Sequence, residues 1–471
     1  MRHDLRLLVA DRTLWVIAAL FVVLIGYGIF NGARWTGERQ RRVNELTQRG
    51  EKSLSENRSE LAAIESGAKP VSSPVPQAML PTDKSYPVTL PPAPLASLSV
   101  GQSDLYPYAA SIDIYTAKHA IFNIYEQDNP INLLAGRFDL AFVLVYLIPL
   151  LILTLSYNLL SQERESGTLS MTMAQAPISL STIALGKVAM RLVIVLALAI
   201  GLSLLGLMLS RAPLGVDGAL PRVLLWAVAV VAYALFWFAV AVAVNALGKS
   251  SAANAMALVG IWIVLVVVMP SLLSIAASAA HPVPSRLEFI AKVREADNYT
   301  RSASQQLLAK YYGDHPELVP AGELDLTDFT RRFYAIRQEH QRRLLPEMMR
   351  FEEQLARQQS LIRHYSILSP AVVMQDALNS IAGTGSERQK EFVAQVRSFI
   401  DQWQSFFVPL VFRKAMLKTT DYDHIPRFKF QEEPTATVAA RVGRGLLLLV
   451  GPALMIGAFA LARLRRYSLA R

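Results

Sequence analysis

Cysteine is absent from this sequence, and charged residues are scarce. None of the 471 residues is Cys, and only 18% are Asp, Glu, Lys or Arg, whereas 52% are hydrophobic. The lack of thiols excludes disulfide frameworks, cysteine nucleophiles and zinc–thiolate sites. Because soluble domains average about 25% charged residues, the composition indicates a membrane protein. The 25 Pro and 24 Gly are ordinary for this length and exclude a collagen-like or low-complexity chain.

Ionisable residues are nearly absent from six apolar stretches that approach or exceed the roughly 20 residues needed to cross a bilayer. Asp139 and Arg222 lie at the ends of two stretches, where we expect their side chains to reach the membrane interface. Channels, ion-coupled carriers and intramembrane proteases place ionisable groups at membrane depth, so the sequence argues against these classes. Pro149 and Pro270 interrupt the second and fifth stretches. We interpret them as kinks, with a functional hinge as the alternative. The stretches are residues 14–30, 138–160, 192–209, 223–247, 252–280 and 445–464.

The distribution of basic residues predicts the orientation. The formal net charge is +10, and the surplus lies at the termini, in short loops and at the ends of the apolar stretches. Residues 31–136 and 281–437 are nearly neutral. By the positive-inside rule, both termini are predicted in the cytoplasm and both long segments outside. The basic charge is therefore a topology signal and does not indicate nucleic-acid binding. The first stretch resembles a signal peptide, but a poor cleavage site follows it, so we interpret it as an uncleaved anchor.

These observations predict an all-α polytopic membrane protein with six transmembrane helices, an N-in/C-in topology and a mostly helical extracytoplasmic domain. The boundaries fall into nine parts. They are an amphipathic cytoplasmic connecting helix (1–13), the first span (14–30), a first extracytoplasmic segment (31–136), the second span (137–160), a cytoplasmic loop (161–191), spans three to five (192–280), a second extracytoplasmic segment (281–437), the sixth span (438–464) and a cytoplasmic tail (465–471).

The two long segments contain signals of local structure. Residues 35–64 are charge-dense and lack proline, which predicts a helix that continues the first span. Eight prolines between residues 70 and 94 then indicate an extended connector, and residues 111–116 are β-prone. Two apolar stripes in the second segment predict packed helices, with breaks at Ser369-Pro370 and Gly383-Thr384-Gly385. The stripes are Leu344, Met348, Phe351 and Leu355, and Phe392, Val396, Phe399, Trp403 and Phe406.

No catalytic or metal-binding residues are predicted in this chain. Gly248-Lys249-Ser250 resembles the end of a phosphate-binding loop, but Ala243 stands where that motif requires glycine. The seven histidines show no metal-ligand spacing. We therefore expect that the chain is not itself an enzyme and binds no cofactor.

The most informative segment is the cytoplasmic loop 161–191. Glu163 and Glu165 extend from the second span, Gly167 breaks the helix and Thr168 can cap a new short helix. Leu169 adds an apolar side chain, and Pro177 restarts the chain toward the third span. A short helix beside two carboxylates suits docking into a groove of a soluble partner. An ordinary amphipathic turn at the interface is the alternative.

This loop resembles the E-x-E-x-G-T coupling element of ABC exporter permeases of type 2 (the type V exporter fold). Further stretches are similar to a bacterial subfamily with large external insertions after spans one and five. The resemblance implies that Glu163, Glu165, Gly167, Thr168 and Leu169, with Pro177 and Lys187, form the interface with a separate ATPase subunit. The other matching stretches are residues 101–107, 129–130, 136–139, 369–370, 382–384 and 421–428.

The resemblance also implies partners and location. It implies a dimer of ABC ATPase subunits that binds ATP and Mg, a second permease copy or paralogue, and membrane lipid along the connecting helix. The expected location is the bacterial inner membrane. The leading hypothesis is the permease subunit of an ATP-driven exporter. One alternative is a mechanotransmitter that acts on an extracytoplasmic partner without moving cargo, and another is a scaffold or sensor without a motor.

Overall fold

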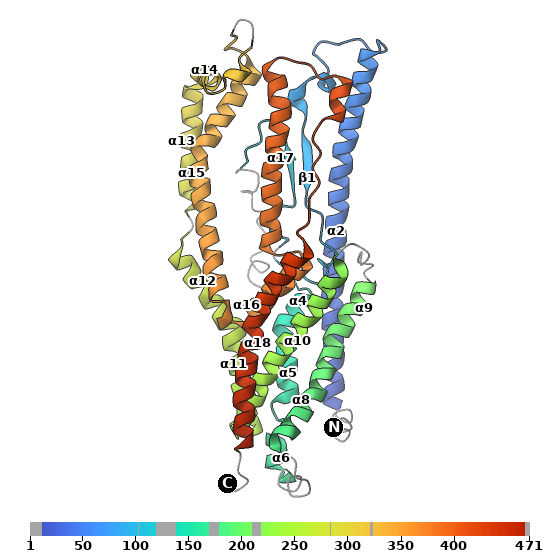
Figure 1. Ribbon diagram of the computed structural model, residues 1–471, viewed down its shortest axis with the longest axis vertical. Helices are drawn as coiled ribbons and strands as arrows, with labels where there is room; N and C mark the ends of the chain where they lie inside the picture. The colour runs from blue at the N-terminus through green and yellow to red at the C-terminus, as the bar shows by residue number, and fades with distance from the viewer. Residues whose placement is uncertain are drawn as a thin grey trace.

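The computed structural model is an elongated, mostly helical molecule (Figure 1) that describes residues 12–101, 103–118, 138–168, 179–209, 218–282, 284–320 and 324–466. Within these residues, six helical segments are long and apolar enough to cross a membrane, and they coincide with the six predicted stretches. The segments are Trp15–Glu65, Leu140–Glu165, Leu180–Met208, Ala219–Ala246, Ser251–Ala280 and Thr435–Arg465.

The apolar helices pack around one central helix, α10 (Ala219–Ala246). It contacts α5, α8, α11, α16 and α18, and most of its apolar window is buried. Tyr233 and Trp237 fill the middle of this core, and the Tyr233 hydroxyl donates to the Val145 carbonyl at 2.7 Å. The surrounding helices are α2 (Arg12–Glu65), α4 (Leu140–Phe142), α5 (Ile148–Ser156), α8 (Leu180–Leu196), α9 (Leu202–Leu209), α11 (Ser251–Trp262), α12 (Met269–Ala280), α16 (Pro370–Ala382) and α18 (Thr435–Arg465).

The prolines of the second and fifth predicted spans each follow a π-helical turn. Val143–Leu147 precedes Pro149, and Ile263–Val268 precedes Pro270. Proline has no N–H and its ring crowds the carbonyl four residues earlier, so a wider turn relieves the conflict. The helical winding therefore changes locally just before each proline. Such a change is a recognised structural cause of a helix kink, as the kink interpretation requires.

The two long segments form one distal domain at the end of the molecule opposite α6 (Ser161–Glu165) (Figure 1). Buried side chains of both segments share one core, which includes Leu61 and Ile112 from the first segment and Trp403 from the second, and a smaller separate cluster joins α13 and α15. The domain contains the distal half of α2, β1 (Tyr86–Thr89), β2 (Ala109–Ile112), α13 (Arg286–Ser302), α14 (Ser304–Asp314), α15 (Phe329–His364) and α17 (Ser386–Phe412).

The all-α prediction is wrong in one respect, because β1 and β2 pair as a two-stranded antiparallel sheet. β1 lies inside the segment predicted as a proline-rich connector. Tyr86, Val88 and Leu90 alternate with more exposed residues and are buried, so hydrophobic packing gives this short stretch a strand conformation. Pro87 is tolerated because the sheet has only two strands, both of them at an edge.

The predicted apolar stripes lie in helix–helix contacts. Leu344 and Met348 of α15 bury against Ala296 of α13, and the stripe that begins at Phe392 lies along the core of the distal domain. α16 begins at Pro370 with the Ser369 hydroxyl as its N-cap, so the predicted break there is confirmed.

Candidate functional site

The structure describes five of the seven predicted interface residues. Glu163 and Glu165 belong to α6, Gly167 and Thr168 follow it, and Lys187 belongs to α8. α6 lies at the end of the molecule where α2 begins and α18 ends (Figure 1). Leu169 and Pro177 lie outside the described residues, as does most of the predicted connecting helix 1–13. We call α6 and the residues that contact it the coupling face.

Glu163 forms an ion pair inside the protein. Its carboxylate lies 2.6 Å from the Lys187 ammonium, which also donates to the Leu159 carbonyl at 3.1 Å. Lys187 is buried because it follows Leu180 and Ala184 along one face of α8, at helical spacing, and this face packs against the end of the second span. Glu163 therefore connects α6 to α8.

Glu165 connects α6 to the next pair of spans. Its carboxylate accepts hydrogen bonds from the Ser251 N–H at 2.7 Å and the Ser251 hydroxyl at 3.0 Å, at the first residue of α11. A carboxylate is favourable there because the first N–H groups of a helix lack helical partners. Arg164 donates to the Lys249 carbonyl in the turn between α10 and α11. Gly167 has a φ of +71°, which explains why the helix ends at a glycine.

Two buried asparagines support the break between α5 and α6, and sequence reasoning missed both. Asn245 of α10 donates to the Ser156 carbonyl at 2.9 Å, and Asn254 of α11 donates to the Tyr157 carbonyl at 3.3 Å. Their side chains also meet each other, at 3.3 Å. Donors from three helices, with Lys187 as the third, therefore satisfy carbonyls of the irregular segment 156–160. The available signal was two asparagines in apolar runs on either side of a Gly-Lys-Ser turn.

Asp139 and Arg222, which lie at the ends of predicted spans, are both buried within the protein. Asp139 accepts hydrogen bonds from the Phe142 and Val100 N–H groups, both at 2.7 Å, so it caps α4 and fixes the loop near residue 100. Arg222 is 6% exposed and donates to the Ile381 carbonyl at 3.5 Å. These charges are satisfied by main-chain groups of the distal side instead of by water.

A cavity of about 590 Å³, which sequence reasoning also missed, lies where the distal domain meets the spans. Its walls come from the loop near residue 105, the start of the second span, the end of α15, one side of α16, the first turn of α17 and the first half of α18. We call it the junction cavity. Its charged lining residues are Asp139, Arg363, Asp376, Glu387, Arg441 and Arg444.

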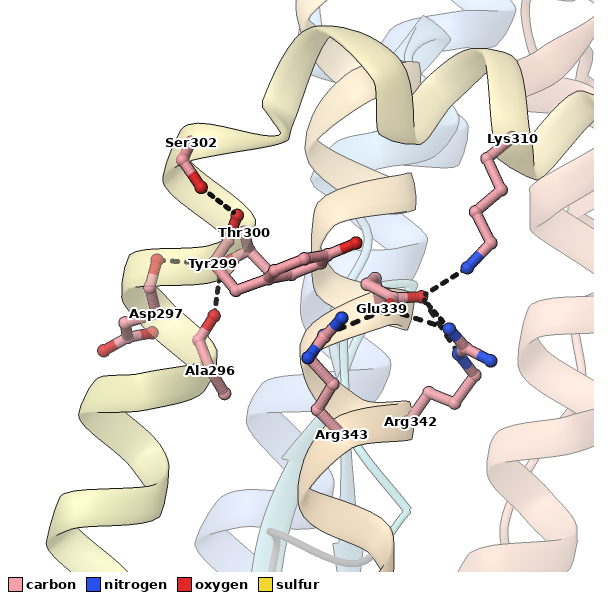
Figure 2. Close-up of polar contacts among 9 residues, drawn as sticks. All are labelled: Ala296, Asp297, Tyr299, Thr300, Ser302, Lys310, Glu339, Arg342 and Arg343. Atoms are coloured by element: carbon pink, nitrogen blue, oxygen red, sulfur yellow. Dashed lines mark hydrogen bonds and ion pairs between the residues drawn. The ribbon is translucent and has the colours of Figure 1, made fainter.

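A second polar cluster joins the distal helices α13, α14 and α15 (Figure 2). The buried Glu339 carboxylate accepts hydrogen bonds from the Arg342 and Arg343 guanidinium groups at 2.9 to 3.0 Å and from the Lys310 ammonium at 3.4 Å. Burial acts to raise the pKa of Glu339, but hydrogen bonds and charge from Arg342 and Lys310 outweigh it and lower the pKa. The Arg343 guanidinium also lies over the Tyr299 ring. Because its charges are mutually paired, this cluster holds the helices together.

Within the residues that the structure describes, no three His, Asp or Glu side chains gather as metal ligands would. Residues 286–431 match the family described as Domain of unknown function (DUF3526). The matched segment begins at the first residue of α13 and ends before α18, so it contains none of the helices that could cross a membrane. No curated protein and no solved structure matches the chain. The match therefore describes part of the distal region, and the role of the coupling face is argued from its geometry.

Proposed function

We propose that this chain is the membrane permease subunit of an ATP-driven ABC transporter, with an exporter as the leading form. The observation that carries the proposal is the placement of α6. This five-residue helix is connected to α8 through Glu163 and to α11 through Glu165, and an irregular segment separates it from α5. A partner that binds α6 would therefore move three membrane helices together.

The irregular segment gives this movement a structural basis. Side-chain donors bond to the Ser156, Tyr157 and Leu159 carbonyls, so the regular helical ladder of α5 does not continue unbroken into α6 and α6 can shift relative to α5. The ion pair of Glu163 and the cap from Glu165 then transmit the shift to neighbouring helices. This is the mechanical role that the resemblance assigns to a coupling element.

The proposal places nucleotide chemistry in the partner. A separate dimer of ATPase subunits binds ATP and Mg, and this chain supplies no catalytic group. A second copy or a paralogue of the chain completes the membrane unit. The location is the bacterial inner membrane, with both termini and α6 on the cytoplasmic side and the distal domain outside.

A mechanotransmitter is the second candidate, and the continuity of α2 favours it. This single helix of 54 residues extends from the end near α6 into the core of the distal domain. There Glu51 and Arg58 form ion pairs with Arg427 and Asp423, at 2.8 and 2.9 Å. A displacement of the first span would therefore be carried to the distal domain.

Affinity purification in mild detergent from the native host tests the ATPase assignment. We expect a subunit with Walker motifs, and ATP hydrolysis, to co-purify with the wild-type chain. The double variant Leu169→Asp/Met171→Asp, which replaces two apolar residues of the predicted loop 161–191, is expected to lose both. Val71→Asp is the matched control, because Val71 is 58% exposed and lies on the distal side. The proposal is refuted if wild type recovers no ATPase, or if the loop variant recovers as much as wild type.

Labelling separates the two candidates. The chain contains no cysteine, so Val71→Cys/Leu287→Cys can carry two spin labels without background. An ATP-dependent change in their distance, with no cargo present, favours the mechanotransmitter. An unchanged distance, together with ATPase activity that requires cargo, favours export.

A further inference from the structure

The junction cavity contains charged and polar groups that the protein leaves without strong partners. Among the described residues, Asp376 makes no hydrogen bond and Arg444 contacts only the Ala440 carbonyl of its own helix, at 3.4 Å. The amide oxygen of Gln359 is buried and has no hydrogen-bond partner. The Asp376 and Arg444 side chains are exposed to the cavity volume, so a ligand can contact both, and the buried Gln359 oxygen is a polar group that the described residues leave unsatisfied.

The other charges of the cavity are already paired. Arg363 binds Glu387 at 2.5 Å, and Arg441 binds Glu433. Asp376 and Arg444 form no ion pair with each other in the described part of the chain. A ligand would therefore meet one free negative charge and one free positive charge.

Burial affects the free carboxylate. It raises the pKa of Asp376, and the charge of Arg363 acts in the opposite direction. Asp376 nevertheless faces the open volume of the cavity, so a ligand can reach its carboxylate. A cationic group at this position would stabilise the ionised form of the carboxylate.

The cavity also changes from polar to apolar along the membrane helices. Leu448 follows Arg444 by one turn of α18, and Phe142 and Tyr146 follow Asp139 by about one and two turns of the second span. The charged groups therefore lie toward the distal domain and the apolar groups toward the bundle. A soluble ion would leave the apolar wall uncovered, whereas an amphiphile covers both parts.

We propose that the junction cavity binds the headgroup and upper chains of a zwitterionic amphiphile, whose ammonium contacts Asp376 and whose phosphate contacts Arg444. The volume of about 590 Å³ lies within the range of about 300–1,000 Å³ typical of small-molecule sites. An ethanolamine phospholipid supplies the two charges in the same headgroup, and its apolar chains extend along Phe142, Tyr146 and Leu448. The site stands on this geometry alone, whether or not an ATPase binds the coupling face.

Native mass spectrometry of the purified full chain in detergent tests the site, without nucleotide or ATPase. The probes are phosphatidylethanolamine, phosphatidylglycerol and soluble phosphoethanolamine. We expect one ethanolamine lipid per chain, bound more tightly than the glycerol lipid, and weak binding of the soluble headgroup. Asp376→Asn is expected to reduce affinity for the ethanolamine lipid by about tenfold, as loss of a charge-assisted contact does, and to remove the preference between lipids.

Arg444→Gln is expected to weaken both lipids, because both contain a phosphate. Arg413→Gln on the exposed surface of the distal domain is the matched control and should bind as wild type does. Thermal unfolding midpoints within the error of wild type show that the cavity variants remain folded. The proposal is refuted if Asp376→Asn and Arg444→Gln bind the ethanolamine lipid as wild type does. It is also refuted if the two lipids bind equally to wild type, or if the soluble headgroup binds as tightly as the lipid.

Discussion

The ion pair between Glu163 and Lys187 makes a quantitative prediction about the coupling face. The Lys187 side chain is only 8% exposed and the Glu163 side chain 31%, with their charged atoms 2.6 Å apart. Glu163→Gln leaves a buried ammonium whose remaining acceptor among the described residues is the Leu159 carbonyl, at 3.1 Å. Removal of one partner from a fully buried pair costs about 3–5 kcal/mol. Because water reaches part of Glu163, we expect a loss of about 2 kcal/mol in the free energy of unfolding.

A double-mutant cycle separates the ion pair from other effects of each substitution. Lys187→Met removes the charge but keeps an apolar chain against Leu180 and Ala184, so we expect a loss of about 1 kcal/mol, mainly from the unsatisfied Leu159 carbonyl. The double variant should lose little more than Lys187→Met alone. The expected coupling energy is therefore about 2 kcal/mol.

The assay is reversible unfolding of the full chain in mixed micelles with increasing dodecyl sulfate, monitored by tryptophan fluorescence. Glu353→Gln is the matched control, because the Glu353–Arg357 pair has the same 2.6 Å separation but side chains that are 58% and 54% exposed. Exposed pairs contribute about 0.5 kcal/mol or less, so this control should change stability little. The reasoning is refuted if Glu163→Gln costs no more than the control, or if the Glu163 and Lys187 variants are additive. In that case Glu163 is free to act at the surface alone.

Three further predictions follow from single positions. Glu165→Gln weakens the cap of α11, so it should cost about 1 kcal/mol and increase amide hydrogen exchange in the first turn of that helix. Burial lowers the pKa of Lys84 to about 8, so its charge destabilises the folded state below pH 8, and the free energy of unfolding rises as the pH increases from 8 to 10.5. Lys84→Met should therefore stabilise the protein by about 2 kcal/mol at pH 7 and lose this advantage by pH 10.5. Thermal unfolding at several pH values measures both effects. Gly32→Ala would place a Cβ 2.0 Å from a main-chain oxygen and should cost more than about 2 kcal/mol, whereas Gly26→Ala meets nothing within 4 Å and should be tolerated.

Hydrophobic periodicity predicted the parts of the fold that depend on one segment at a time. The six apolar stretches and the stripe from Leu344 to Leu355 are local patterns, and each gave the helix that the structure contains. β1 was missed because only Tyr86, Val88 and Leu90 alternate there, among prolines that indicate a connector. Its strand conformation depends on the core supplied by α17, about 300 residues later in the sequence.

The candidate sites were predicted less well because their contacts are distant in sequence. The motif identified Glu163 and Lys187, but nothing in their spacing showed that they form a pair with each other. The junction cavity brings together Asp139, Asp376 and Arg444 from three separate elements. No local pattern places such residues around one volume, so the cavity could be recognised only after the fold was known.

One helix connects the two sites. Near its end, α18 packs Ala460 and Leu464 against the segment that holds Leu159, beside the coupling face. Near its start, the same helix contributes Arg444 to the junction cavity. α18 is one continuous helix of 31 residues with Pro452 between these two ends, and a displacement at the coupling face that passes this proline changes the position of Arg444 relative to Asp376 on α16. Under the proposed function, ATP binding by the partner should therefore change the affinity for the zwitterionic lipid. An unchanged lipid affinity in the ATP-bound complex would show that the two ends of α18 are uncoupled.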